Sequence, residues 1–208
     1  MESLFSRVFK RRLCNIYSII LMIKVIKTFF NKKIKLLKIK PFKDNRGYFT
    51  ETFNKKNYKL ADINENFVQD NQSLSISKGT IRGLHYQSPP KQQSKLIAVQ
   101  KGSIQDIIVD IRKKSKTYGN YVSVIMTDKE FTQLYIPVGF AHGFCTLSNN
   151  TLINYKTSNY YSKKHEYCIL WKDTELSIDW KISNNNIKIS KKDSKGIIFN
   201  DFNSPFKC

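Results

Sequence analysis

The stretch Lys95-Leu-Ile-Ala-Val99, followed by Ile104-Gln-Asp-Ile-Ile-Val-Asp-Ile111, holds two short runs of β-branched and other apolar residues. Such runs are typical of β-strands when turn residues bound them, as they do here. Similar runs recur at intervals of about ten residues, a spacing that favours an all-β sandwich or barrel over βαβ units. They are Lys33–Lys40, Tyr48–Phe53, Tyr121–Met126, Gln133–Ile136, Phe144–Leu147 and Thr151–Tyr155. We predict an all-β fold with few short helices, in which only residues 54–64 look helical.

The formal charge of +20 first suggests a nucleic acid or an acidic surface as partner. Its distribution argues against this, because residues 1–45 carry 12 basic and 2 acidic side chains whereas residues 46–180 carry 18 and 12. A nucleic-acid binder would interleave basic and stacking aromatic residues on one face. We therefore predict no nucleic-acid partner. The 208 residues are 40% hydrophobic and 13% aromatic, which excludes a disordered chain.

The amino-terminal segment has a charged-then-apolar order, with the apolar run spanning residues 13–23. That run is too short to cross a bilayer, which needs roughly 20 residues, and no small-x-small cleavage site follows it. Met22 offers a second start. We expect residues 1–21 to be an upstream extension, residues 22–208 to form a single domain, and the protein not to insert stably into a membrane.

The four cysteines lie far apart and form neither a CxxC nor a Cys/His pattern; they are Cys14, Cys145, Cys168 and Cys208. This arrangement argues against a zinc site and against a dense disulfide framework. We therefore predict a reduced, cytoplasmic protein.

Two polar clusters are candidates for a functional site. In the first, Arg82, His85 and Lys95 could form a cationic cleft containing a proton-accepting imidazole, although solvated charges and an ordinary half-buried histidine would give the same pattern. In the second, His142 could be a metal ligand, a substrate contact or a hydrogen-bonding core residue. Metal binding is disfavoured because Gln87, not a histidine, follows His85 at i+2. His165 is expected to be exposed and without a role.

These clusters belong to an ordered series of motifs: Arg46-Gly-Tyr-Phe49-Thr-Glu51, Gln69-Asp-Asn71, Arg82-Gly-Leu-His-Tyr-Gln87, Gln93-Ser-Lys-Leu96, Asp106-x3-Asp-x-Arg112, Ile136-Pro-x-Gly-Phe-Ala-His-Gly-Phe144, Tyr155-Lys-Thr-x2-Tyr-Tyr161, Trp171-x-Asp173 and Ser190-Lys-Lys-Asp193. Together they closely resemble dTDP-4-dehydrorhamnose 3,5-epimerases over residues 22–200. The resemblance implies a cupin-type jelly-roll barrel, no metal or organic cofactor, and a homodimer with exchanged amino-terminal strands. The implied reaction inverts carbons 3 and 5 of dTDP-4-dehydro-6-deoxy-D-glucose to give dTDP-4-dehydro-L-rhamnose.

The same resemblance assigns four catalytic roles. His85 matches the base, and Asp193 matches the carboxylate that orients it. Lys95 matches the cation beside the C4 oxygen, where charge develops, and Tyr155 matches the acid that returns a proton from the opposite face. Asp173, in Trp-Lys-Asp, is the rival carboxylate for the pair with His85.

Substrate-binding residues follow from the resemblance as well. Positions near the diphosphate and sugar are matched by Arg46, Gln69, Asn71 and Arg82. Aromatic positions around the thymidine are matched by Phe42, Phe49 and Tyr160. Two further pocket positions are matched by Glu51 and His142. Of these residues, Arg46 and Phe49 could serve the site of the neighbouring subunit. One departure is Ser94, which stands where the family usually has Gly.

Two alternatives stay open at this point. A mono-epimerase acting at only carbon 3 or carbon 5 of a related dTDP-4-ketosugar would use the same base, lysine and tyrosine. A non-catalytic cupin could bind an anionic ligand, although the presence of all four catalytic groups argues against loss of activity.

Overall fold

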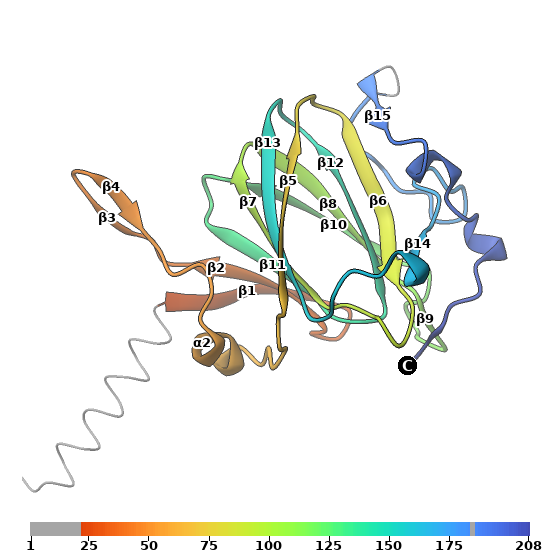
Figure 1. The fold of residues 1–208 in the computed structure, drawn as a ribbon, viewed down its shortest axis with the longest axis horizontal. Helices are drawn as coiled ribbons and strands as arrows, with labels where there is room; N and C mark the ends of the chain where they lie inside the picture. The colour runs from red at the N-terminus through yellow and green to blue at the C-terminus, as the bar shows by residue number, and fades with distance from the viewer. Residues whose placement is uncertain (1–21, 184–185) are drawn as a thin grey trace, which may run out of the picture.

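The computed structural model describes residues 22–183 and 186–208, which form two facing, largely antiparallel β-sheets (Figure 1). The first sheet has the order β1 (Ile23–Phe29), β2 (Ile34–Ile39), β11 (Thr132–Ile136), β7 (Lys95–Lys101), β13 (Thr151–Thr157) and β5 (Gln69–Ser75). The second has the order β10 (Tyr121–Thr127), β8 (Ser103–Asp110), β12 (Phe140–Thr146), β6 (Thr80–Gln87) and β14 (Glu166–Cys168), and β15 (Lys188–Ile189) pairs with β6 in parallel.

The smaller elements lie outside the two sheets. A hairpin of β3 (Phe42–Asp44) and β4 (Gly47–Phe49) projects away from the barrel (Figure 1). The strands β9 (Arg112–Lys113) and β16 (Phe206–Lys207) pair in parallel. The helical elements are α2 (Lys55–Leu60) and the short 3-10 turns η1 (Lys163–His165), η3 (Asp193–Lys195) and η4 (Phe199–Asp201).

The barrel interior is filled by alternate residues of both sheets. Ile97 of the first sheet and Ile104 and Ile108 of the second belong to one buried apolar cluster. The other face of the second sheet is covered by the carboxy-terminal segment, where Phe199 and Phe202 pack in a separate cluster. Alternation with period two therefore buries both faces of the second sheet. The predicted all-β, cupin-type jelly roll is confirmed.

Two predicted elements have different ends in the structure. The strand predicted over Tyr48–Phe53 ends at Phe49, because the next residues turn towards the helix. There the Glu51 carboxylate accepts hydrogen bonds from the Nδ2 atoms of Asn54 (2.9 Å) and Asn57 (2.7 Å).

The helix predicted over residues 54–64 is shorter, because it ends at Leu60. Asn54 caps its first turn by accepting from the N–H of Lys56 at 3.1 Å, as expected for an N-cap asparagine. Asp62 lies in the left-handed region at φ 55°, which stops the helix.

The predicted division of the chain at residue 22 stays a prediction, because residues 1–21 lie outside the described residues. Within the described residues, none of the helices has the length and apolar character needed to cross a bilayer.

Candidate active site

Polar side chains replace apolar ones at one end of the barrel interior. Lys95 lies on the same face of β7 as the buried Ile97, two residues further along the strand. Asp106 lies between the interior residues Ile104 and Ile108 of β8. The period of two residues therefore points Lys95 and Asp106 into the space between the sheets.

His85 of β6 makes the central contact of this polar end. Its Nε2 lies 2.7 Å from Oδ1 of Asp193, at the start of η3. Asp193 is 4% exposed and its other oxygen accepts from the backbone N–H of Gly83 at 3.3 Å. Burial raises the pKa of Asp193, but the hydrogen bond and charge of His85 and the Gly83 N–H outweigh burial, so the net shift is downward. Asp193 therefore carries a negative charge against the imidazole.

Two glycines allow β6 to approach β12 beside His85. Gly83 has φ 117°, and a Cβ there would lie 2.5 Å from the Cα of Gly143. Gly143 is equally confined, because its own Cβ would lie 2.8 Å from the carbonyl oxygen of Arg82. Only glycine satisfies both the backbone conformation and the contact, and this close approach sets His85 directly opposite His142 in the register.

Lys95 is the half-buried cation of the site. Its Nζ donates to the backbone carbonyl of His85 at 3.5 Å. Burial lowers the pKa of Lys95 to about 8, and the nearby carboxylates of Asp106 and Glu166 oppose part of that shift. An ammonium group therefore persists at neutral pH but is held weakly, which suits a group that meets a developing negative charge.

His142 and Asp106 form a second histidine–carboxylate pair, with Nε2 and Oδ1 at 2.7 Å. Burial lowers the pKa of His142, while Asp106 opposes the shift and the charges of Lys95 and His85 add to it, so the imidazole is neutral at pH 7. Oδ2 of Asp106 is buried and has no hydrogen-bond partner among the described residues. A buried polar oxygen of this kind is a position where a ligand hydroxyl can donate.

Tyr155 of β13 faces the same interior from the first sheet, packed against the apolar cluster. Burial raises the pKa of its phenol, so the phenol stays protonated at neutral pH. Its register partner is Asn71 of β5, whose Oδ1 accepts from Gln69 Nε2 at 2.7 Å. Asn71 Nδ2 is buried without a partner in the described part of the chain, so it is free to donate to a ligand.

Arg82 lies close to the His85–Asp193 pair, because all three residues line the same hollow. Its guanidinium donates to Ser75 Oγ and to the carbonyl of Leu74, both at 3.3 Å, which leaves further N–H groups for an anion. The structure thus brings together the four predicted catalytic residues and, from the predicted binding residues, His142, Arg82, Asn71 and Gln69.

Five other predicted binding residues lie elsewhere. Phe42, Phe49 and Arg46 belong to the exposed hairpin β3–β4, where Arg46 pairs with Asp44. The Glu51 carboxylate accepts the hydrogen bonds from Asn54 and Asn57 at the start of α2. Tyr160 is exposed, and its carbonyl accepts from Gln87 Nε2 at 3.2 Å, near the carboxyl end of β6.

Asp173, the rival partner for His85, has a structural task instead. Its carboxylate is buried and accepts from the backbone N–H groups of Glu175, Leu176 and Phe199 at 2.9, 3.0 and 2.7 Å. The structure therefore pairs His85 with Asp193, and the rival prediction for Asp173 is wrong.

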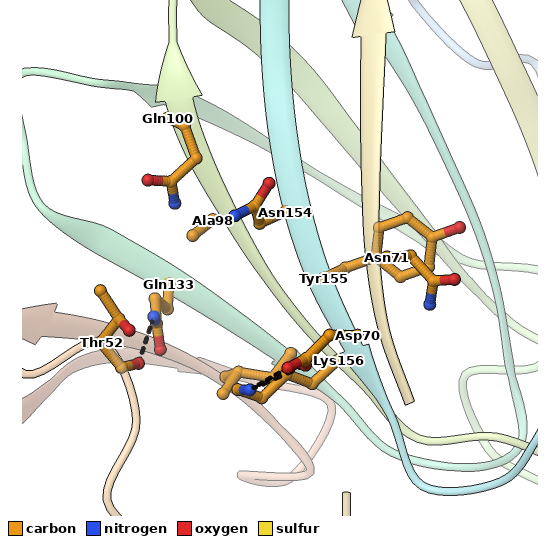
Figure 2. Close-up of a pocket in the computed structure, with 10 residues that line it drawn as sticks. Thr52, Asp70, Asn71, Ala98, Gln100, Gln133, Asn154, Tyr155 and Lys156 are labelled. Atoms are coloured by element: carbon orange, nitrogen blue, oxygen red, sulfur yellow. Dashed lines mark hydrogen bonds and ion pairs between the residues drawn. The ribbon is translucent and has the colours of Figure 1, made fainter. Parts of the chain in front are cut away.

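A hollow on the opposite side of the first sheet contains different chemistry (Figure 2). Figure 2 shows Asn154 and Gln100 on one side of β13 and Tyr155 pointing to the other. The hollow contains the ion pair of Lys156 with Asp70, at 2.7 Å, but no histidine. Most of its lining residues lie on the outer face of the sheet, and it meets the group around His85 only through Asn71 and Tyr155.

Sequence reasoning missed two residues of the polar end as site residues. Asp106 occurs in a motif quoted above without a role that the sequence alone indicates, and Cys168 belongs to no CxxC or Cys/His pattern. Cys168 pairs with His85 in the register of β14 and β6, and its Sγ lies 4.0 Å from Asp193 Oδ1. The donor atoms of His85, Cys168 and Asp193 all lie within 4.8 Å of one another, so these residues could hold a metal ion.

The fold and this group of side chains define a cupin-type jelly-roll enzyme built around a His–Asp pair, a half-buried lysine and a tyrosine. The family model for dTDP-4-dehydrorhamnose 3,5-epimerase matches residues 32–201. The chain belongs to the dTDP-4-dehydrorhamnose 3,5-epimerase family, and the predicted class of enzyme, an isomerase, is confirmed.

Individual relatives agree with this assignment. A dTDP-4-dehydrorhamnose 3,5-epimerase of Shigella flexneri is 47% identical over 163 residues, which are 78% of this chain and 88% of the relative. The crystal structure of such an epimerase from Bacillus anthracis, with TDP and PPi bound, has a TM-score of 0.82 and 46% identity, covering 85% of this chain and 99% of that one. The epimerase of Legionella pneumophila, in complex with dTDP-4-keto-L-rhamnose, has a TM-score of 0.82 and 40% identity, with 87% and 95% covered.

Proposed function

We propose that this protein inverts carbons 3 and 5 of dTDP-4-dehydro-6-deoxy-D-glucose, giving dTDP-4-dehydro-L-rhamnose. The observation that carries the proposal is the 2.7 Å contact of His85 Nε2 with Asp193. Because the carboxylate is buried and ionised, it holds the ring proton on Nε2 and leaves the Nδ1 lone pair free. A neutral histidine oriented in this way is a base for a C–H bond next to a ketone.

Lys95 makes that proton removable. Taking a proton from carbon 3 or carbon 5 places negative charge on the C4 oxygen, and an ammonium group buried in a low-dielectric interior stabilises that charge strongly. Lys95 is a half-buried cation beside His85, since its Nζ donates to the His85 carbonyl. The imidazolium formed at His85 is stabilised in turn by Asp193.

Tyr155 completes the inversion from the other sheet. His85 belongs to β6 of the second sheet and Tyr155 to β13 of the first, so a sugar ring held between the sheets meets them on opposite faces. The phenol gives its proton to the enolate carbon, and solvent restores the phenol proton and removes the proton from His85. The configuration changes with no redox step, and the same cycle acts on the second carbon.

The substrate class is supported by the relatives. Their structures hold TDP with PPi and dTDP-4-keto-L-rhamnose, which support a dTDP-ketosugar as the substrate here. In this chain Arg82 offers guanidinium N–H groups for a diphosphate, and Asn71 Nδ2 and Asp106 Oδ2 offer unpaired buried donors and acceptors for the sugar.

The test is proton NMR in deuterated water with dTDP-4-keto-6-deoxyglucose and the purified protein. We expect deuterium at both carbon 3 and carbon 5 with the wild type, and none with His85→Ala. Deuterium at only one carbon would select the mono-epimerase instead. No incorporation by the folded wild type, together with retained binding of dTDP, would select the non-catalytic cupin.

We further propose a homodimer in which each amino-terminal segment serves the other subunit. The hairpin β3–β4 lies away from the barrel and far from β6 (Figure 1). It nevertheless exposes three large aromatic side chains, Phe49 at 70%, Tyr48 at 63% and Phe42 at 46%, together with Arg46. An isolated hairpin with exposed aromatics gains stability by packing on a partner, and a second copy of this chain would place these side chains against its nucleotide site.

Mixing two inactive variants tests this exchange. If Arg46 acts in the partner's site, a hybrid of His85→Ala and Arg46→Ala subunits has one site with both residues intact. Random subunit exchange between the two then restores about a quarter of wild-type activity. Recovery to no more than the sum of the separate variants, with hybrids shown to form, would place Arg46 in the site of its own subunit.

The cytoplasm is the compartment we propose, supported by the free thiols of Cys145, Cys168 and Cys208. Cell fractionation with antibody detection tests it. We propose no nucleic-acid partner, and a salt-sensitive DNA mobility shift would contradict that.

A further inference from the structure

Beside the base, three side chains converge that the proposed reaction does not use together. Cys168 lies directly opposite His85 in the antiparallel pair of β14 and β6, and Asp193 reaches the same point from η3. The Cys168 thiol has no part in the proton transfers, and its Sγ lies 3.4 Å from the carbonyl of Ile169. Three elements separated along the chain therefore place one nitrogen, one sulfur and one oxygen donor within 4.8 Å of one another.

This donor set suits zinc. Zn²⁺ takes tetrahedral N, S and O ligands at about 2.0–2.3 Å, so its ligand atoms are separated by roughly 3.3–3.7 Å. The separations here are 2.7 Å between His85 and Asp193 and 4.0 Å between Cys168 and Asp193. All three donor atoms lie within 4.8 Å of one another, so shifts of about 1 Å would admit the ion. The side chain of His85 is 27% exposed, which leaves a path for the ion and a position for a water as fourth ligand.

The charges around the cluster are compatible with a divalent cation. Asp193 is ionised, and a thiolate at Cys168 would bring the ligand charge to that needed to neutralise Zn²⁺. Lys192 lies nearby, but its ammonium forms an ion pair with Glu166. Metal ligation needs the thiolate, so a bound ion displaces the proton of the Cys168 thiol.

We propose that His85, Cys168 and Asp193 form an inhibitory site for Zn²⁺ that switches off the base. In the free protein the ring proton is on Nε2 and the basic lone pair on Nδ1. Zinc bonded to Nε2 needs that lone pair, so the ring proton moves to Nδ1, the imidazole stays neutral, and the basic lone pair is lost. The Cys168 thiol proton leaves to solvent, so one proton is released for each ion bound.

The inhibition rests on the proposed role of His85 as base, whereas metal binding does not. Binding is therefore tested first with Co²⁺, whose thiolate complexes absorb in the near ultraviolet and whose tetrahedral sites absorb in the visible. We expect one equivalent of Co²⁺ to give both signals with the full-length protein. Cys168→Ser is expected to lose the thiolate band and to bind Co²⁺ at least tenfold more weakly. Cys145→Ser is the matched control, since Cys145 is also buried and free but lies outside the cluster.

Inhibition by Zn²⁺ is then measured, with each variant compared with its own metal-free rate. We expect the inhibition midpoint of Cys168→Ser to rise at least tenfold over wild type, that of Cys145→Ser to stay unchanged, and a chelator to restore activity. An unchanged thiolate band or midpoint in Cys168→Ser, or no band in the wild type, would overturn the proposal. A cobalt signal in a protein without epimerase activity would remove the proposed function and leave the metal site standing. Cys168→Ala serves if the serine variant does not fold.

Discussion

Replacing Asp193 by Asn removes the negative charge of the His85–Asp193 pair while keeping a side chain of nearly the same shape. The carboxylate is 4% exposed, and it holds both His85 Nε2 at 2.7 Å and the Gly83 N–H at 3.3 Å. In the variant, the Gly83 N–H holds the amide oxygen. The amide NH2 group then faces His85 and donates to Nε2, which places the ring proton on Nδ1. The imidazole keeps its position but loses the lone pair that takes the substrate proton.

The expected loss follows from the charge. When His85 becomes an imidazolium, its attraction to a carboxylate about 4 Å away between charge centres is worth about 4 kcal/mol at an effective dielectric constant near 20. At about 1.36 kcal/mol per factor of ten, kcat falls by about 10³-fold. The assay is the rate of product formation by NMR, on protein shown to be folded by circular dichroism.

Asp173→Asn is the control, because Asp173 is an equally buried aspartate that binds only backbone N–H groups. We expect it to lower the melting temperature and to leave kcat of the folded fraction within a few-fold of wild type. If folded Asp193→Asn retained kcat within threefold of wild type, while Asp173→Asn lost activity, the assignment of the pair would be refuted.

Three further predictions concern the neighbouring groups. The pKa of Lys95 is lowered to about 8, and its ammonium form is the active one. We therefore expect kcat/KM to fall tenfold for each pH unit above about 8. A value of kcat/KM that does not change up to pH 10 would contradict this. Tyr155→Phe should lower epimerisation by about 10²–10⁴-fold while Lys95 and His85 still allow enolate formation, seen by NMR as deuterium exchange without inversion. Gly83→Ala should lower the melting temperature much more than Gly47→Ala. Both glycines have a positive φ (117° and 138°), but only at Gly83 would a Cβ meet backbone, at 2.5 Å. Equal decreases in melting temperature would show that strain in φ alone matters.

The local hydrophobic pattern of the sequence was enough to predict the strands and the candidate site residues that lie on them. The alternation in β7 reports which residues share a face, and in the structure Lys95 lies on the same face as the interior residue Ile97. The strand predicted over Tyr48–Phe53 is too long, because it ends at Phe49 in the structure. Glu51 makes side-chain hydrogen bonds to α2 that compete with continued strand pairing. Such competition depends on residues further along the chain, and periodicity does not report it.

The partners of His85 could not be derived locally. Asp193 is 108 residues away in a lysine-rich tail, and it was found only through resemblance to a family. Cys168 is in register with His85 only because β14 adds to the edge of β6. The spacing rule that argued against metal ligands considers one strand at a time, whereas this cluster is assembled from three elements. Long-range pairing in a β-barrel is the information that a single sequence lacks.

A neutral imidazole has two nitrogens and one proton, and this constraint links catalysis with the proposed inhibition. In Asp193→Asn and in the zinc-bound protein alike, the proton of His85 moves to Nδ1, although the causes differ. Neither change touches Arg82 or Asn71, which we propose as contacts of the nucleotide sugar. Both should therefore strongly lower turnover while leaving the dissociation constant of dTDP, measured by titration calorimetry, within about threefold of wild type, a difference below 1 kcal/mol. A parallel loss of dTDP affinity would show instead that the His85–Asp193 pair shapes the nucleotide site, and the explanation by proton position would fail.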